Sequence, residues 1–169
     1  PLFSAGSRGG GARAADVPAM SVGGAPERPV VPRGDLKGIL RSAFGFDAFR
    51  PNQEAVCRAV TEGQPALLVM PTGAGKSLCY QLPGLARGGT TVVVGPLIAL
   101  MEDQVAKLQA RGLAAERIHS GRGRDASREA CRAYLKGELD FLFIAPERLG
   151  IPGFTQLLAK RPPTLVAVD

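Results

Sequence analysis

The sequence predicts an α/β protein built on an open, mainly parallel β-sheet with helices on both faces. Segments of helical character alternate along the chain with short apolar runs, at 66–70, 91–94, 114–118, 141–144 and 165–168. These runs are continuously apolar rather than alternating, which is typical of strands that are covered on both faces. Strand–helix alternation of this kind indicates parallel strands joined by right-handed crossovers.

Helices are expected between and before these runs. Four apolar residues of the segment 98–111 recur at helical spacing and would line one buried face: Ile98, Met101, Val105 and Leu108. Further helices are expected at 76–86, 125–136 and 151–160. Upstream, a short helix should run from Leu36 to about Phe44, and another should begin at Pro51, where a missing N–H costs nothing.

Composition excludes several classes of protein. The chain has 169 residues, of which 45% are hydrophobic and 21% charged, which is typical of one globular domain or part of one. Its longest apolar stretch, 92–101, is interrupted by Gly95 and Pro96, so no membrane span is expected. The three cysteines have no metal-ligand spacing and their odd number argues against a disulfide framework. A cytoplasmic protein is expected, associated with the nucleoid if the source is bacterial.

The two ends of the sequence have a different character. Residues 1–34 are rich in Gly, Ala and Pro without apolar periodicity, and are expected to form a disordered tail ahead of a domain at 35–169. The sequence starts with Pro1 and stops at Asp169 directly after an apolar run, so we expect it to be a piece of a longer protein. The net charge of +6 permits a polyanionic partner without demonstrating one.

A glycine-rich loop at 70–77 is the most specific motif, reading Met-Pro-Thr-Gly-Ala-Gly-Lys-Ser. Gly73 and Gly75 allow a tight turn, so that backbone N–H groups of the loop (Thr72, Gly73, Ala74 and Gly75) can converge on phosphate oxygens. Lys76 would reach the β- and γ-phosphates, and Ser77 would offer its hydroxyl to Mg²⁺. Met70 stands where the strict pattern has Gly, so the loop is a variant. Because it follows an apolar run and opens a helix, we expect it to bind nucleotide phosphates.

Asp169 follows the last apolar run. Ligands of open parallel sheets lie outside the carboxyl ends of the strands, so this carboxylate is expected near the phosphate loop. An isolated Asp after a strand is usually a turn or helix cap. Beside a phosphate loop, a role in holding Mg²⁺ opposite Ser77 is favoured.

Several segments together resemble a RecQ-type DNA helicase of superfamily 2. They are Phe44-Gly45-Phe46, Phe49 to Gln53, 70–83, 92–105, 144–149 and 165–169. The resemblance covers about 36–169, with the motifs in the family's order. The family continues after Asp169 with Glu-Ala-His.

The resemblance implies a RecA-like lobe that binds ATP and Mg²⁺, with Lys76 and Asp169 as catalytic residues. It also implies that Gln53 reads the adenine edge while Phe46 and Arg50 pack on the base. Asn52 departs from the family's usual Gly. DNA, as single strands and at duplex junctions, would bind through its sugar-phosphate backbone to the segments Pro96–Gln104 and Pro146–Arg148. The plainer alternative places Asp103 and Gln104 on a solvent face, with Leu97 and Leu100 packed.

By this resemblance the parent protein would be an ATP-dependent 3′–5′ DNA helicase in repair and recombination. The base that orients the attacking water is expected in the Glu after Asp169. This chain alone should therefore bind nucleotide weakly, hydrolyse it negligibly and unwind nothing. Two alternatives stay open: another phosphate-loop enzyme, such as a kinase or transport ATPase, and a non-catalytic nucleic-acid-binding module.

Two further features have plain interpretations. Arg124, Arg128 and Arg132 are interpreted as a solvated basic face of a helix, and His119 is interpreted as a loop residue.

Overall fold

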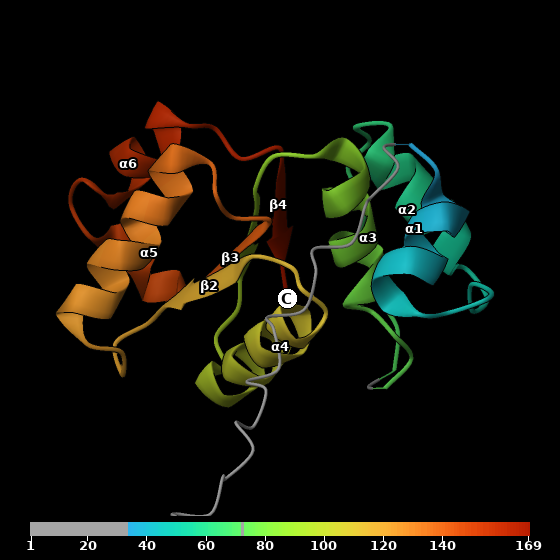
Figure 1. Cartoon of the computed structure of the whole chain (residues 1–169), viewed down its shortest axis with the longest axis horizontal. Coiled ribbons are helices and arrows are strands. Elements are labelled where there is room, and N and C mark those ends of the chain that lie inside the picture. Colours follow the sequence, from blue (N-terminus) through green and yellow to red (C-terminus); the bar gives the residue numbers. More distant parts are fainter. Residues whose placement is uncertain (1–33, 72) are drawn as a thin grey trace, which may run out of the picture.

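The computed structural model describes residues 34–71 and 73–169 (Figure 1). The expected disordered tail therefore lies outside the described residues except for Gly34, and Thr72 of the phosphate loop also lies outside them. The elements, in chain order, are α1 (Leu36–Phe44), α2 (Gln53–Thr61), α3 (Leu78–Arg87), β1 (Thr91–Val94), α4 (Ile98–Ala110), β2 (Ala115–Ile118), α5 (Arg124–Lys136), β3 (Phe141–Ile144), the 3-10 helix η1 (Pro146–Gly150), α6 (Phe154–Lys160) and β4 (Leu165–Val168). Within these described ranges, no helix has the length and apolar character needed to cross a bilayer.

The strands form one parallel sheet in the order β2-β3-β1-β4. Val92 of β1 pairs with Leu142 of β3 on one side and with Val166 of β4 on the other. Each connection between parallel strands passes through a helix, as parallel pairing requires. The predicted α/β class with a parallel sheet is confirmed.

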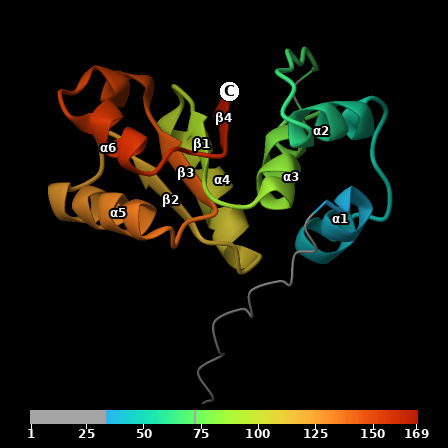
Figure 2. The same ribbon diagram turned by 90° about the horizontal axis from the view of Figure 1, so that it is seen from above.

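Helices cover both faces of this sheet, because successive side chains of a strand point to opposite sides. Val93 belongs to a buried cluster with residues of α1, α3 and α4. Val92 and Val94 belong to a second cluster with residues of α5 and α6. Figures 1 and 2 show α5 and α6 on one side of the strands, and α1, α2 and α3 on the other.

The predicted strand at 66–70 is wrong. The backbone of these residues forms no ladder, and the side chains of Leu67 and Val69 are 94% and 88% exposed. A cavity of about 400 Å³ lies between residues 65–68 and β4, so the two backbones do not meet as hydrogen-bonded neighbours. An apolar run becomes a strand only where a partner supplies the backbone hydrogen bonds.

The predicted covering of every strand on both faces holds only for the middle of the sheet. All residues of β1 and β3 are buried. In β4, which pairs with β1 alone among the described strands, Val166 and Val168 are exposed, so the described part of the chain does not cover the face on which they lie. Apolar composition therefore identified β4 as a strand but not its position at the edge of the sheet.

Candidate functional site

The turn at Gly73–Gly75 has a backbone shape that favours glycine. The backbone angle φ is +81° at Gly73 and +92° at Gly75, a region that other residues rarely adopt. A β-carbon on Gly75 would lie 2.5 Å from Nε2 of Gln53. Glycine is therefore favoured at position 75 by conformation, and a β-carbon there would also displace the amide of Gln53.

Lys76 and the start of α3 follow this turn. The Nζ atom of Lys76 donates a hydrogen bond to the carbonyl oxygen of Met70 at 3.2 Å, so its side chain spans the loop. Helix α3 begins at Leu78, and the positive end of its dipole lies at the same place. An ammonium group beside a helix N-terminus is a combination that favours anions.

Gln53 and Arg50 hold the loop from the side of α2. Gln53 is 2% exposed. Its Oε1 accepts a hydrogen bond from the N–H of Arg50 at 2.9 Å, and its Nε2 donates one to the carbonyl oxygen of Gly75 at 3.1 Å. The guanidinium of Arg50 donates to the carbonyl oxygen of Gly73 at 2.8 Å. The structure thus brings both residues against the phosphate loop.

Asn52 has a positive φ of 68° at the residue before α2. Asn is among the non-glycine residues that tolerate this left-handed conformation best. The departure from Gly at this position is therefore compatible with the turn that leads into α2. Its side chain makes no capping hydrogen bond to α2.

Phe46 lies apart from these contacts. The residue is 47% exposed, and its backbone N–H donates to the carbonyl oxygen of Leu40 at 3.1 Å. Phe46 is not among the residues that line the cavity at the phosphate loop. The structure leaves its ring free to stack, without placing it over the loop.

A cavity of about 630 Å³ joins the phosphate loop to the carboxyl ends of the strands and to α4. It is lined by loop residues (Gly73, Gly75, Lys76, Ser77), strand and strand-end residues (Val93, Gly95, Phe143, Asp169) and residues before and within α4 (Pro96, Leu97, Leu100, Met101, Gln104). This is the place where open parallel sheets bind ligands.

Asp169 and Ser77 both line this cavity. The backbone N–H of Asp169 donates to the carbonyl oxygen of Val94 at 2.9 Å, which fixes the residue beside the end of β1. The hydroxyl of Tyr80 lies 3.5 Å from Oδ2 of Asp169 and donates to it. Burial raises the pKa of Tyr80 well above its usual range, so the phenol keeps its proton.

A magnesium ion would find oxygen donors at this place. The carboxylate of Asp169 and the hydroxyl of Ser77 are the ligand types that Mg²⁺ accepts, with water completing its shell. Within the described residues there is no group of three or more His, Cys, Asp and Glu side chains that could form an all-protein metal site.

A chain of hydrogen bonds, which the sequence did not reveal, links α3 and α4 across the cavity wall. Nε2 of Gln81 donates to Oε1 of Gln104 at 2.8 Å, and Nε2 of Gln104 donates to Oγ of Ser77 at 3.2 Å. Gln81 is a buried polar residue of a mostly apolar helix, which was the available signal. Gln104 is therefore not a residue of a purely solvent-exposed face.

The two segments expected to contact DNA, 96–104 and 146–148, lie at different places in the fold. Leu97 and Leu100 are exposed at the mouth of the cavity, so the interpretation that both pack in the core is wrong, whereas Met101 is buried. The segment 146–148 forms the start of η1. There the guanidinium of Arg148 lies 5.9 Å from the ring centre of Phe154, on the side of the sheet covered by α5 and α6.

His119 lies in the loop directly after β2, as the sequence suggested, but it is buried and has a partner that the sequence did not reveal. It is 5% exposed, and its Nε2 lies 2.8 Å from Oε1 of Glu102. Arg117 lies 2.7 Å from the other oxygen of the same carboxylate. Hydrogen bonds from Arg117 and then His119 lower the pKa of Glu102 from 4.5 to about 2. These contacts fasten α4 to the end of β2.

A parallel sheet with a glycine loop, a Lys-Ser pair and a carboxylate at a strand end defines a phosphate-loop nucleotide-binding lobe of the RecA-like class. The sequence profile of the DEAD/DEAH box helicases matches residues 50–163. The chain belongs to the DEAD/DEAH box helicase family.

Named relatives narrow the family to the RecQ type. The chain is 41% identical over 131 residues to the ATP-dependent DNA helicase RecQ of Haemophilus influenzae, covering 78% of this chain and 21% of that protein. It is 40% identical over 134 residues to the RecQ of Bacillus subtilis, covering 79% and 23%. The chain thus spans about a fifth of the length of these relatives. It is similar to RecQ-type helicases, as the motifs indicated.

A solved structure shows the same fold. The crystal structure of the DUF1998 helicase MrfA bound to DNA superimposes with a TM-score of 0.59 at 21% sequence identity. The match covers 76% of this chain and 19% of that one. The RecA-like fold expected from the sequence is confirmed.

Proposed function

We propose that this chain is the ATP-binding lobe of an ATP-dependent 3′–5′ DNA helicase of the RecQ type that acts in DNA repair and recombination. The observation that supports it most is the shared cavity, which places the phosphate loop, Asp169 and α4 around one space. Relatives at about 40% identity carry the name ATP-dependent DNA helicase. Unwinding belongs to the longer protein, and nucleotide binding belongs to this lobe.

The phosphate loop supplies the phosphate-binding part. Backbone N–H groups of Thr72, Gly73, Ala74 and Gly75 bind phosphate oxygens, and Lys76 leaves the carbonyl of Met70 to bind the β- and γ-phosphates. Its positive charge then stabilises the charge that develops during phosphoryl transfer to water. Ser77 and Asp169 hold Mg²⁺, which supplies further charge neutralisation when bound.

Gln53, Arg50 and Phe46 supply the base-binding part. A side-chain amide can pair with both the amino group and a ring nitrogen of adenine. Both ends of the Gln53 amide are bonded to the protein in this structure, so reading a base requires it to exchange the Arg50 N–H and Gly75 carbonyl for the adenine edge. Arg50 and the exposed ring of Phe46 then stack on the base.

The segments 96–104 and 146–148 supply the DNA-binding part. Backbone N–H groups and polar side chains near strand ends bind phosphates of a single strand. Leu97 and Leu100 are exposed beside this path. The solved structure of MrfA, which has the same fold, is of a helicase bound to DNA.

Measurements of two ligands on the same chain test this proposal. We expect Mg-ATP and a fluorescent single-stranded oligonucleotide both to bind, and Lys76→Ala to abolish the first while sparing the second. A kinase or transport ATPase would bind Mg-ATP without the oligonucleotide. A nucleic-acid-binding module with a degenerate loop would bind the oligonucleotide alone. Either of these outcomes contradicts the proposal.

A further inference from the structure

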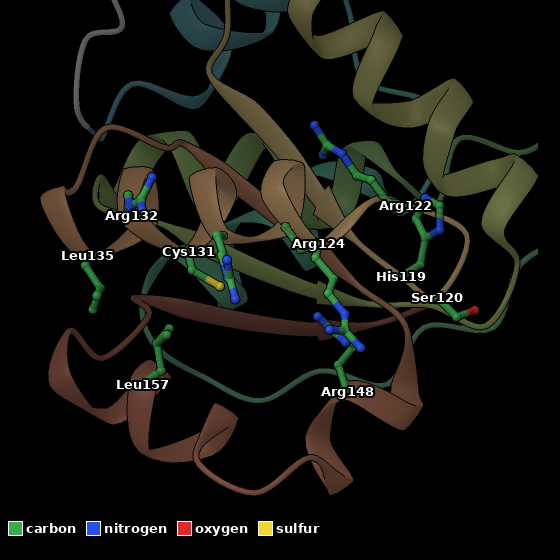
Figure 3. Close-up of a pocket in the computed structure, with 11 residues that line it drawn as sticks. His119, Ser120, Arg122, Arg124, Cys131, Arg132, Leu135, Arg148 and Leu157 are labelled. Atoms are coloured by element: carbon green, nitrogen blue, oxygen red, sulfur yellow. The ribbon is translucent and has the colours of Figure 1, made fainter.

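A second cavity, of about 620 Å³, lies on the opposite side of the sheet from the phosphate loop. Its walls come from α5, from the turn after β2 and from η1 and α6 (Figure 3). Its lining contains five arginines, Arg122, Arg124, Arg128, Arg132 and Arg148, together with Ser120 and Ser127, and no carboxylate. We call this cavity the arginine groove.

Two of the arginines lack a neutralising partner. In the described part of the chain, neither Arg124 nor Arg148 forms an ion pair, and Nε of Arg148 is buried without a hydrogen-bond partner. Figure 3 shows their guanidinium groups pointing toward one another from α5 and η1. Converging cations without a carboxylate between them repel each other, and an anion placed between them removes that repulsion.

The backbone adds to this positive character. Helix α5 begins at Arg124 after Gly123, which makes no side-chain capping bond, and its first turn carries one acidic residue, Asp125, whose side chain is fully exposed. The positive end of the helix dipole lies at Arg124, which lines the same cavity as Arg148. Arg122 is already neutralised by Glu116 in a mostly buried ion pair, so it is not available to an anion. Arg128 and Arg132 pair only at the surface: Arg128 lies 3.7 Å from Asp125, and Arg132 lies 3.2 Å from Glu129. Such exposed pairs are worth little and exchange readily for phosphate.

The spacing of the arginines fits a polymer rather than a single small anion. Arg124, Arg128 and Arg132 follow one another at intervals of four residues, so they extend over roughly 12 Å of helix axis. Phosphates of one strand of B-form DNA follow one another at ~3.4 Å along the axis, so this length corresponds to three or four nucleotides. Arg148, the last residue of the segment 146–148, lines the same cavity as these three arginines.

We propose that the arginine groove binds the phosphodiester backbone of DNA and extends the DNA path from Arg148 along α5. This inference rests on the proposed function, because that function brings DNA to residues 146–148. Arg124 and Arg148 clamp one phosphate, whereas Arg128 and Arg132 follow the next phosphates along the helix. No base is read there, so the groove contributes affinity without sequence preference.

Salt-dependent binding of a fluorescent oligothymidylate to the whole chain tests the proposal. The test variant is Arg124→Gln/Arg128→Gln/Arg132→Gln. The control, Lys37→Gln/Arg41→Gln/Arg58→Gln, removes three exposed cations from α1 and α2. We expect the test variant to lose about tenfold or more in affinity at low salt, and the slope of log affinity against log salt to become shallower by roughly 2. The control should keep the parent slope.

A second measurement tests directly whether DNA occupies the arginine groove. Cys131 lines the groove, whereas Cys57 and Cys79 are buried, so a maleimide should label Cys131 first. We expect the oligothymidylate to slow this labelling several-fold in the parent and not in the test variant. Mg-ATP binding should be unchanged in both variants, which separates this inference from the proposed function.

The outcomes are distinct. Parent-like DNA affinity and salt slope in the test variant, with Mg-ATP binding intact, would overturn the groove and leave the proposed function standing. An acidic peptide that protects Cys131 better than the oligothymidylate would assign the groove to a protein partner and overturn the DNA inference. A test variant that loses Mg-ATP binding as well would show a general structural role, which also overturns it.

Discussion

The side-chain amide of Gln104 donates a hydrogen bond to Oγ of Ser77 at 3.2 Å. Ser77 is the residue proposed to hold Mg²⁺, and Gln104 lies in the segment proposed to contact DNA. One hydrogen bond therefore joins the two candidate binding regions. Gln81 completes the chain by donating to Oε1 of Gln104 at 2.8 Å.

Removing Gln104 should cost stability through Gln81. Gln104→Leu removes the acceptor of the hydrogen bond from Nε2 of Gln81. Because Gln81 is buried, its unpaired donor lowers the free energy of unfolding by about 1–3 kcal/mol. Gln81→Leu in the same chain removes the orphaned donor. We expect the double variant to be more stable in urea unfolding than the sum of the single effects predicts. Additive losses would show that the two amides do not interact.

Gly75 should tolerate substitution less well than Gly73. Both have positive φ, which costs a β-carbon roughly 1–2 kcal/mol, but only at Gly75 would that β-carbon collide with Gln53. Gly75→Ala is therefore expected to lower the free energy of unfolding by more than Gly73→Ala. Urea unfolding of the two variants measures the difference. Adding Gln53→Ala should relieve part of the Gly75→Ala effect, and no relief would argue against the collision.

Asn52 offers a test of backbone conformation alone. Because its φ is 68° and its side chain makes no capping bond, Asn52→Gly should be neutral or slightly stabilising. Asn52→Ala should destabilise the chain by roughly 1 kcal/mol, since alanine has no means of easing the left-handed conformation. Thermal unfolding of the pair measures this. Equal melting temperatures for the two variants would mean that the positive φ is not maintained.

The carboxylate of Glu102 should make stability depend on pH. Its pKa is about 2 in the folded chain against an ordinary value of 4.5, so its contribution is fully present above about pH 5 and is lost as the pH falls toward 2. Because the side chain is partly exposed, that contribution is below about 1 kcal/mol. Glu102→Gln should be less stable than the parent at pH 7, and the gap should narrow in acid. A gap that does not change with pH would contradict this.

Strands were predicted correctly from the sequence where an apolar run is also buried in the structure. The runs that became β1 and β3 are buried on both faces, so their composition alone carried the information. The run at 66–70 has the same composition but no hydrogen-bonded neighbour, and composition cannot reveal a missing partner. The exposure of Val168 in β4 depends in the same way on the position of the strand in the sheet.

In the candidate site, too, the local features could be predicted from the sequence and the contacts between distant residues could not. The glycine turn and the Lys76-Ser77 pair are local, so their spacing in the sequence was enough to propose them. The contacts of Ser77 with Gln104 and of Glu102 with His119 join residues 27 and 17 positions apart. Such contacts depend on how α4 packs against its neighbours, which no local pattern records. The arginines of α5 were visible as a row, but their convergence with Arg148 needed the fold.

Calorimetric titration of the chain with Mg-ATP tests the central claim most directly, because the claim is that residues 70–77 form a phosphate-binding loop. The comparison is between the parent, Lys76→Ala and the charge-matched Lys107→Ala, whose side chain pairs with Asp103 on the exposed surface of α4. We expect saturable binding by the parent and by Lys107→Ala, and a loss of at least about tenfold for Lys76→Ala, equivalent to ~1.4 kcal/mol. Parent-like affinity in a folded Lys76→Ala chain would contradict the account.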